Sequence, residues 1–251
     1  MVEKVVLITG AARGIGLATA HLMAHEGWRV VLLDRDKEAL DLASAKFGGA
    51  ALSLLQDVSD PQGAPRAIAA CLDRFGRLDA LVNNAGVADF NPIEKTDFEA
   101  WRRVMETNLD GVFLMTQAAI PALKETKGAI VNIGSISGLR ASTLRVAYGT
   151  SKAAVIHLTR QQAAELGEYG IRANCVCPGP VRTKLAMAVH TQEIIDAYHD
   201  AIPLNRYGSE TEIGEVIAFL CSSKASYVTG QIIASDGGFE STGVGLPALR
   251  S

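Results

Sequence analysis

Two side chains, Tyr148 and Lys152, have the types and the spacing of an acid–base pair. Four residues is just over one helical turn, so both would project from one helix face. A free phenol has a pKa of about 10 and is a poor base at neutral pH. An ammonium about 5 Å away, at an effective dielectric of about 20, favours the phenolate by about 3 kcal/mol. The pair could therefore exchange a proton with a hydroxyl, although an ordinary exposed helix pair has the same spacing.

Polar side chains in other segments could complete such a site. Ser135 ends an apolar run thirteen residues before Tyr148, and 82–86 ("VNNAG") ends another. Open α/β sheets bind ligands at the carboxyl ends of their strands, so a hydroxyl at this edge can hold a substrate oxygen. Asn108 interrupts a helical pattern in which asparagine is a poor helix former, which makes it a further candidate.

A glycine-rich stretch near the N-terminus indicates a nucleotide site. Residues 5–20 ("VVLITGAARGIGLATA") predict a strand, a turn and a helix, with glycines at positions 10, 14 and 16. Glycine lets the backbone turn tightly and approach a pyrophosphate, whose charge then faces the open N–H groups of the helix. A plain strand-to-helix turn would have a similar composition, so the glycines alone do not establish a nucleotide site.

Asp34 strengthens the nucleotide interpretation. It ends the second apolar run, 18 residues after Gly16, where a carboxylate can accept hydrogen bonds from both hydroxyls of an adenosine ribose. A 2′-phosphate would meet like charge there, so the sequence predicts NAD as the cofactor and NADP as the less favoured one. Arg35 is the opposing signal, because its guanidinium could hold a 2′-phosphate if the carboxylate turned away.

Seven short runs, each apolar at successive positions, alternate with longer helical patterns. Such runs are typical of strands that helices cover on both faces. They predict an α/β protein with a single-domain Rossmann fold over 1–251, in which a doubly wound, seven-stranded parallel sheet carries helices on both faces. The predicted strands are 4–9, 29–34, 50–57, 78–84, 128–135, 171–178 and 230–236.

Helical periodicity supports this organisation. Apolar residues recur at intervals of three and four over 98–115, and the same pattern runs from Gly149 to about Gly167. The interval 184–208 is the longest without a predicted strand, and we interpret it as a substrate lid.

Composition excludes several classes of partner. A net charge of -3 gives no basic patch for nucleic acid or an anionic membrane, and no apolar run is long enough to span a bilayer. The first residues lack the pattern of a signal peptide. Four cysteines without CxxC spacing suit a reducing cytoplasm, and we expect Cys175 and Cys177 to form a buried thiol pair rather than a metal or redox site.

Other polar residues carry weaker signals. His21 and His25 have a spacing that can hold a metal ion, but no third ligand is evident, and no metal site is predicted. His190 is either a solvent-facing side chain of the lid or a substrate contact. Arg140 and Arg145 lie between Ser135 and Tyr148, and Arg145 could meet an anionic substrate or form a surface ion pair.

Nine features in chain order resemble the short-chain dehydrogenase/reductase family. They are "TGAARGIG" (9–16), Asp34, "DV" (57–58), "NNAG" (83–86), Asn108, Ser135, "YGTSK" (148–152), "PGPVRT" (178–183) and "DGG" (236–238).

The resemblance implies roles for the catalytic candidates. Tyr148 matches the family's acid/base and Ser135 its substrate-oxygen anchor. Lys152 matches the residue that favours the ionised tyrosine and holds the nicotinamide ribose, and Asn108 matches the position that completes a water-linked proton relay.

The resemblance also implies a cofactor site, in which Asp57 and Val58 match the adenine pocket and Thr183 the residue that binds the nicotinamide carboxamide. The implied contacts are Gly10, Arg13, Gly14, Ile15, Gly16, Asp34, Arg35, Asp57, Val58, Asn84, Ala85, Gly86, Tyr148, Lys152, Pro178, Gly179, Val181 and Thr183.

The implied function is oxidation of a secondary alcohol, such as a polyol, a sugar or a cyclic or aryl alcohol, by hydride transfer to NAD. A 3-oxoacyl-thioester reductase, which more usually runs on NADPH, is the alternative enzyme, and a non-catalytic dinucleotide-sensing protein is the alternative of another class. The resemblance further implies a homotetramer, in which the tail after Asp236 lies near a neighbouring subunit.

Overall fold

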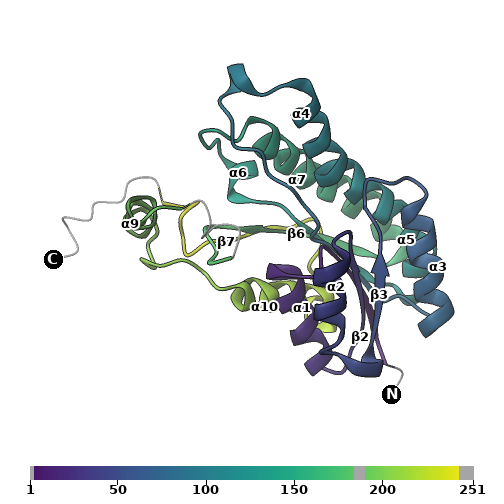
Figure 1. The fold of residues 1–251 in the computed structure, drawn as a ribbon. Coiled ribbons are helices and arrows are strands. Elements are labelled where there is room, and N and C mark those ends of the chain that lie inside the picture. The colour runs from purple at the N-terminus through teal and green to yellow at the C-terminus, as the bar shows by residue number, and fades with distance from the viewer. Residues whose placement is uncertain (1–2, 184–189, 243–251) are drawn as a thin grey trace.

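A seven-stranded parallel sheet forms the centre of the protein (Figure 1). The computed structural model describes residues 3–183 and 190–242, so parts of the proposed lid and of the C-terminal tail lie outside the described residues. The strand order is β3-β2-β1-β4-β5-β6-β7, which confirms the doubly wound α/β prediction. The chain order reverses between β1 and β4, where such sheets open a crevice at their carboxyl edge.

All seven strands lie within the predicted runs. They are β1 Val5–Thr9, β2 Arg29–Asp34, β3 Ala51–Leu55, β4 Ala80–Asn83, β5 Ala129–Ile133, β6 Arg172–Pro178 and β7 Ile232–Ser235. The main differences are at the carboxyl ends, where the predicted runs extend past β3, β4 and β5 into turns. These turns carry several of the candidate site residues.

The helices connect successive strands. The α-helices are α1 Gly14–His25, α2 Lys37–Ser44, α3 Gly63–Phe75, α4 Phe98–Met105, α5 Gly111–Thr126, α6 Ile136–Leu139, α7 Val146–Leu166, α9 Gln192–Ala201 and α10 Glu210–Cys221. A π-helix, η3 Glu106–Asp110, joins α4 to α5. Short 3-10 helices are η1 Gly48–Ala50, η2 Ile93–Lys95, η4 Gly167–Tyr169 and η5 Ser223–Ala225.

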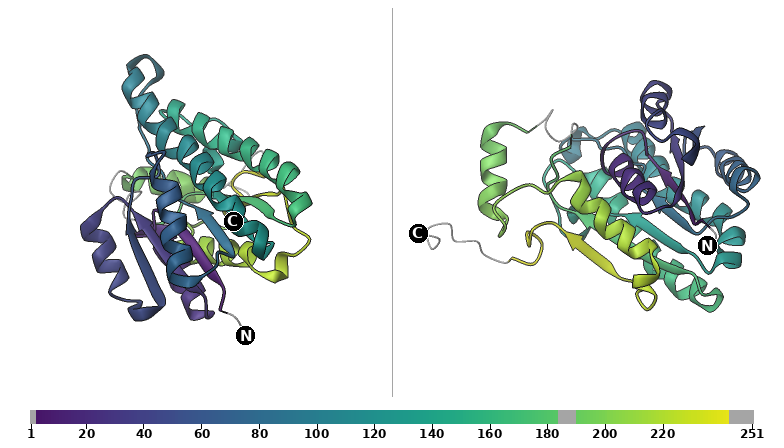
Figure 2. Two further views of the ribbon diagram at one scale, coloured as in Figure 1. Left: turned by 90° about the vertical axis from the view of Figure 1, so that its right-hand side faces the viewer. Right: turned by 90° about the horizontal axis from the view of Figure 1, so that it is seen from below.

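Two layers of helices bury the faces of the sheet (Figures 1 and 2). On one face, Met23 of α1 and Ile217 of α10 pack with β1 residues such as Ile8. On the other, Ile68 of α3 and Met115 of α5 belong to a second apolar cluster. Helix α9 stands apart from both layers (Figure 1). The five inner strands therefore have the two-sided burial that the sequence predicted, whereas the edge strands β3 and β7 are only partly buried.

A buried polar network crosses the second layer. Asn132 of β5 accepts a hydrogen bond from Asn83 of β4 and donates to Thr159 and Gln162 of α7, at 2.9, 2.9 and 2.7 Å. Gln162 also donates to Thr116 of α5 at 3.2 Å. Two strands and two helices are thus held in one register, because a shift would leave buried amides without partners.

Replacing Gln162 by alanine tests this network. We expect Gln162→Ala to lower the free energy of unfolding by about 2 kcal/mol or more, since it removes two buried hydrogen bonds and leaves one N–H of the Asn132 amide without its partner. Denaturant titration measures the loss. The adjacent Gln161 is exposed, and Gln161→Ala should change stability by only about 0.5 kcal/mol. Equal effects of the two variants would contradict a structural role for the network.

Candidate active site

The turn after β1 is built for close backbone approach. Gly10 and Gly14 have positive φ angles of 62° and 61°. A Cβ on Gly16 would lie 2.4 Å from the Gly10 carbonyl oxygen, and a Cβ on Gly10 would lie 2.8 Å from the Cα of Ala85. Asn84 fixes the same turn, because its amide donates to the carbonyl oxygens of Thr9 and Gly10 at 2.9 and 3.0 Å. The glycine turn and the turn after β4 therefore form one unit.

The N-terminus of α1 differs from those of α2, α4, α9 and α10. Each of the latter has a side-chain cap and an acidic residue in its first turn. Arg13 at the start of α1 makes no such cap, and the first turn has no acidic residue. Open N–H groups at a helix start favour an anion. Together with the glycine turn, this fits the phosphates of a dinucleotide.

Charged side chains gather where β2 and β3 end. The Asp34 carboxylate accepts the N–H groups of Ala12 and Asp36, both at 3.0 Å, which fixes it beside the glycine turn. Arg35 forms an ion pair with Asp57 at 3.3 Å. Burial opposes ionisation of Asp57, but hydrogen bonds from Ser59 and Arg35 outweigh it, so the pKa of this carboxyl lies below its usual value.

Other predicted cofactor residues in this region differ in exposure. Arg13 is exposed and pairs with Asp36, whereas Ile15 is half-buried against the core. Val58 is buried at 5% exposure. A Cβ on Gly111 would lie 2.7 Å from the Cγ2 of Val58, so the start of α5 packs tightly against that side chain.

Lys152 is a buried ammonium beneath the carboxyl edge of the sheet. Its side chain is on α7 at 4% exposure, and its Nζ donates to the Ile133 carbonyl oxygen at 2.7 Å. No carboxylate of the described residues pairs with it. An ammonium has three donors, and a buried charge needs polar partners. Within 3–183 and 190–242, two further donors of the ammonium are therefore free for a ligand's oxygen atoms.

Tyr148 lies on the same helix, within reach of that charge. The Lys152 Nζ is 5.8 Å from the centroid of the Tyr148 ring. The tyrosine is half-buried, and its hydroxyl makes no hydrogen bond within 3–183 or 190–242. Helix α7 begins at Val146, before the predicted start at Gly149, so it includes Tyr148. The predicted juxtaposition of phenol and ammonium is present.

Asn108 lies in the π-helix between α4 and α5. Its buried amide donates to Ser151 Oγ at 3.0 Å and accepts the Val87 N–H at 2.8 Å. Ser151 in turn donates to the carbonyl oxygen of Tyr148 at 2.7 Å. A Cβ placed on Gly86 would lie 3.4 Å from the Asn108 Oδ1 and 3.5 Å from the Lys152 Nζ. The turn after β4, the π-helix and α7 thus meet at one point, as π-bulges at functional sites often do.

Ser135 follows β5 and is brought to α7 by two glycines. It caps the N-terminus of α6, and its Oγ accepts the Ser137 N–H at 3.1 Å. A Cβ on Gly138 would lie 2.6 Å from the carbonyl carbon of Lys152, and one on Gly149 would lie 3.0 Å from the Ser137 carbonyl oxygen. The short helix can therefore pack directly against the part of α7 that carries Tyr148 and Lys152.

The segment after β6 completes the edge. Gly179 packs on Asp236, since a Cβ there would lie 2.5 Å from the Asp236 Cβ, and its N–H donates to Ser235 at 3.1 Å. Val181 pairs with Gly208, and the Thr183 N–H donates to the Val181 carbonyl oxygen at 2.7 Å. The predicted residues from Pro178 to Thr183 thus follow the same edge of the sheet.

The buried thiol pair is present beneath the site. Cys175 and Cys177 are both free and buried, with their sulfur atoms 3.8 Å apart. A Cβ on Gly134 would lie 2.7 Å from the Cys177 sulfur, so the pair packs directly under the residue before Ser135. Contact with Cys175 and burial raise the pKa of Cys177, which keeps that thiol protonated.

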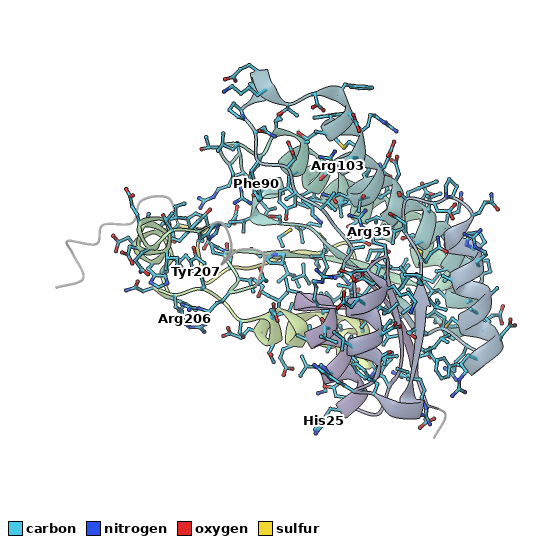
Figure 3. All side chains as sticks on the ribbon, viewed as in Figure 1. His25, Arg35, Phe90, Arg103, Arg206 and Tyr207 are labelled. Carbon is cyan, nitrogen blue, oxygen red and sulfur yellow. The ribbon has the colours of Figure 1, made fainter. Side chains whose placement is uncertain are left out.

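Part of the predicted lid forms an aromatic cluster around α9. His190 stacks on Tyr198 at 5.5 Å, and its Nδ1 is 2.9 Å from the Tyr207 Oη. Burial lowers the pKa of His190, and the charge of Arg145 lowers it further. Figure 3 shows Tyr207 and Phe90 toward α9, and Arg35 on the side of α2 and β3. The residues 184–189 of the lid lie outside the described residues.

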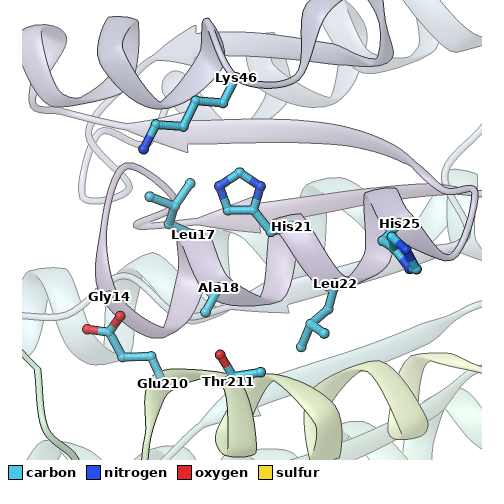
Figure 4. A pocket seen from close by; sticks show the side chains of 9 residues that line it. All are labelled: Gly14, Leu17, Ala18, His21, Leu22, His25, Lys46, Glu210 and Thr211. Carbon is cyan, nitrogen blue, oxygen red and sulfur yellow. The ribbon is translucent and has the colours of Figure 1, made fainter.

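A surface cavity of about 430 Å³ lies along α1 (Figure 4). His21 and His25 line it with Lys46 and Glu210, and His21 also stacks on Phe47 at 4.4 Å. The cavity touches Gly14 but none of the catalytic candidates, so we do not assign the chemistry to it. No group of three potential metal-ligating side chains occurs among the described residues.

Comparison with known proteins identifies the family. A family model described as enoyl-(acyl carrier protein) reductase matches residues 10–240. Meso-2,3-butanediol dehydrogenase of Serratia marcescens is 40% identical, over 94% of this chain and 94% of that protein. Trans-4-hydroxycyclohexanecarboxylate dehydrogenase of Sinomonas cyclohexanicum is 40% identical, over 94% and 92%. The chain belongs to the short-chain dehydrogenase/reductase family.

A solved structure agrees with this assignment. A 3-ketoacyl-(acyl-carrier-protein) reductase from Brucella melitensis complexed with NADH superposes with a TM-score of 0.90 at 34% identity, over 96% of this chain and 100% of that one. The protein is an oxidoreductase that acts on CH–OH groups, and its family binds a nicotinamide dinucleotide. Among the described residues no helix is both long and apolar enough to cross a membrane.

Sequence reasoning did not assign roles to several residues of the site. Ser151, which links Asn108 to Tyr148, lies within the quoted "YGTSK" motif, three residues after the tyrosine. A serine three residues after Tyr148 on one helix lies within reach of the tyrosine backbone, and this spacing could have predicted the link. Ile133 acts through its backbone carbonyl, which no side-chain pattern could reveal.

Proposed function

We propose that this protein oxidises a secondary alcohol to a ketone with NAD, and that Tyr148 is its acid/base. One observation carries the proposal: the buried Lys152 ammonium lies 5.8 Å from the Tyr148 ring without a carboxylate partner in the described part of the chain. A cation at this position attracts the negative charge that develops on the phenol oxygen during proton transfer. The two dehydrogenases reported above act on alcohols of this kind, which supports the assignment.

The proposed mechanism assigns one task to each side chain. Ser135 holds the substrate oxygen, and the Tyr148 phenolate accepts the hydroxyl proton. The electron pair of the broken O–H bond stays on oxygen and forms the carbonyl as hydride leaves the carbon. Lys152 stabilises the phenolate, and Asn108 completes a route by which the proton reaches solvent. The amide of Asn108 is held by Val87 and Ser151, which fixes the π-helix in place for that role.

We propose that the dinucleotide lies along the carboxyl edge of the sheet. The glycine turn would hold its pyrophosphate, Asp34 its adenosine ribose, and Lys152 the ribose next to the nicotinamide. Asp57, Val58, the 84–86 turn and the segment Pro178 to Thr183 would line the rest. When bound, the nicotinamide ring supplies the acceptor for the hydride. Gly10, Gly16 and Gly86 support this placement because they let the turns around the expected cofactor approach one another closely. A Cβ on Gly10 or Gly16 would clash with the backbone there.

The charges beside the adenosine ribose favour NAD over NADP. Asp34 is held by two backbone N–H groups, which leaves its carboxylate near the expected ribose. Arg35 pairs with Asp57 and Arg13 with Asp36, so each guanidinium already has an anionic partner. A 2′-phosphate would therefore meet a fixed negative charge.

A 3-oxoacyl-thioester reductase remains the second candidate. The Brucella melitensis structure is named as such a reductase and is complexed with NADH, so NAD preference does not separate the two reactions. A substrate panel with neutral cyclic alcohols, diols, polyols and hydroxyacyl thioesters, read with both nucleotides, separates them. A dinucleotide-sensing protein would turn over none of these substrates.

Tyr148→Phe tests the proposed acid/base. We expect kcat to fall by about 10²-fold or more, because the ring remains but the transferable proton is lost. NADH binding, measured by fluorescence titration, should change little, since Phe retains the ring. Tyr227 is fully exposed, and Tyr227→Phe is the matched control. Near-normal turnover by Tyr148→Phe would contradict the mechanism.

Asp34→Ala tests the cofactor preference. Removing the carboxylate should lower the ratio of kcat/KM with NAD to kcat/KM with NADP by about tenfold or more, since a charge-assisted hydrogen bond is lost together with the repulsion of a 2′-phosphate. Steady-state rates with both nucleotides measure the ratio. Asp41→Ala removes an exposed carboxylate on α2 and should leave it unchanged. An unchanged ratio in Asp34→Ala would reject the assignment.

We also propose that the protein is a cytoplasmic homotetramer. Four free, buried cysteines suit a reducing compartment. Phe98 of α4 and Phe113 of α5 are 75% and 49% exposed, which supports a subunit interface over these helices. Light scattering should give four times the chain mass, and a monomer at micromolar concentration would contradict the proposal.

A further inference from the structure

Two arginines, Arg140 and Arg145, lie in the segment between Ser135 and Tyr148, and neither has an anionic partner within the described residues. Arg140 directly follows α6, and Arg145 directly precedes α7, three residues before Tyr148. Eight other arginines form ion pairs with Asp or Glu: Arg13, Arg29, Arg35, Arg66, Arg77, Arg102, Arg103 and Arg206. Arg74, Arg160, Arg172 and Arg182 also form no ion pair among the described residues, but they lie outside the segment from Ser135 to Tyr148.

Among the described residues, aromatic rings rather than carboxylates contact both guanidinium groups. Arg145 lies over Phe90 at 4.9 Å from the ring centroid, and Arg140 lies over Phe239 at 4.0 Å. An aromatic ring against the face of a guanidinium holds it in position, while the N–H donors point outward in the plane of the guanidinium. These donors are thus available to an anion that enters the site.

The surroundings of Arg145 leave its charge uncompensated. The backbone of Arg145 pairs with that of Asn91, which brings the loop of Asp89 and Phe90 alongside it. Asp89, however, is already engaged by Arg103 at 3.8 Å and by the Asn91 amide at 3.0 Å. Burial lowers the pKa of His190, and the nearby charge of Arg145 lowers it further; an imidazole carries no negative charge in either protonation state, so it cannot compensate Arg145.

The two arginines also belong to the same end of the site. Phe239, under Arg140, packs on Tyr198 at 5.8 Å, and Tyr198 stacks on His190. This aromatic cluster, His190, Tyr198, Tyr207 and Phe239, thereby joins the surroundings of Arg140 to those of Arg145. The proposed phosphate site lies at the start of α1, after β1, and has its own N–H donors. The cofactor therefore does not require either arginine.

We propose that the substrate is a secondary hydroxy acid, whose carboxylate Arg145 binds, with Arg140 as the second cation, while its hydroxyl reaches Tyr148 and Ser135. A guanidinium presents paired donors that match the two oxygens of a carboxylate. The apolar rings of Phe90 and Phe239 would cover the carbon chain between the two polar ends. This inference rests on the proposed function and specifies its substrate class.

Matched substrates test the charge alone. The probes are 3-hydroxybutanoate, 4-hydroxypentanoate and 5-hydroxyhexanoate, each compared with its carboxamide. For the best chain length, kcat/KM should favour the carboxylate by about tenfold or more, and Arg145→Ala should reduce this preference by about 10- to 100-fold. Arg145→Lys should give an intermediate preference, because lysine keeps the positive charge but lacks the paired N–H donors of a guanidinium. Arg102→Ala, an exposed arginine of α4, is the control and should retain the wild-type preference.

Binding without turnover gives a second readout. With Tyr148→Phe and NADH, the Kd of 4-oxopentanoate should rise about tenfold or more when Arg145→Ala is added. Oxidation of neutral alcohols with no preference for any carboxylate, or a preference that Arg145→Ala leaves intact, would overturn the inference and leave the proposed function standing. If the protein oxidised none of the neutral or charged alcohols, the proposed function would be overturned, and the inference with it.

Discussion

The hydrogen bond from the Lys152 ammonium to the Ile133 carbonyl oxygen is the interaction on which the site depends. It ties a buried charge on α7 to the carboxyl end of β5, and therefore fixes the distance from that charge to Tyr148. A buried ammonium is unfavourable unless polar groups surround it. The backbone carbonyl supplies one partner without neutralising the charge, which leaves the charge to act on the phenol and on a ligand.

Close packing around this interaction requires residues without side chains. Gly138 allows α6 to lie against the backbone of Lys152, and Gly134 accommodates the two thiols under the end of β5. At the other end of the crevice, Gly10 and Gly16 allow the β1 and β4 turns to approach each other. A site assembled from segments far apart in the sequence can be rigid because these contacts leave little freedom for the turns to move.

The sheet, and the edge at which the candidate site residues lie, could be predicted from the sequence for physical reasons. Uniformly apolar runs such as that of β1 can lie only between two layers of helices, and the carboxyl ends of parallel strands necessarily meet at one edge. The prediction that Tyr148 and Lys152 share a helix face does not depend on the exact residue at which α7 begins. Features that depend on backbone atoms were not predictable. The π-helix at Asn108 and the Ile133 carbonyl leave no mark on side-chain periodicity. The partners of Arg35, Arg140 and Arg145 depend on tertiary contacts, which the sequence left open and the structure supplies.

A crystal structure of the complex with NADH and a non-reacting ketone acid tests the central claim most directly. The account predicts the Tyr148 and Ser135 hydroxyls within hydrogen-bonding distance of the same ketone oxygen, and the Lys152 ammonium on the nicotinamide ribose while it still contacts the Ile133 carbonyl oxygen. A complex in which the Lys152 ammonium points away from both the ribose and Tyr148, or in which the ketone oxygen binds elsewhere, would contradict it.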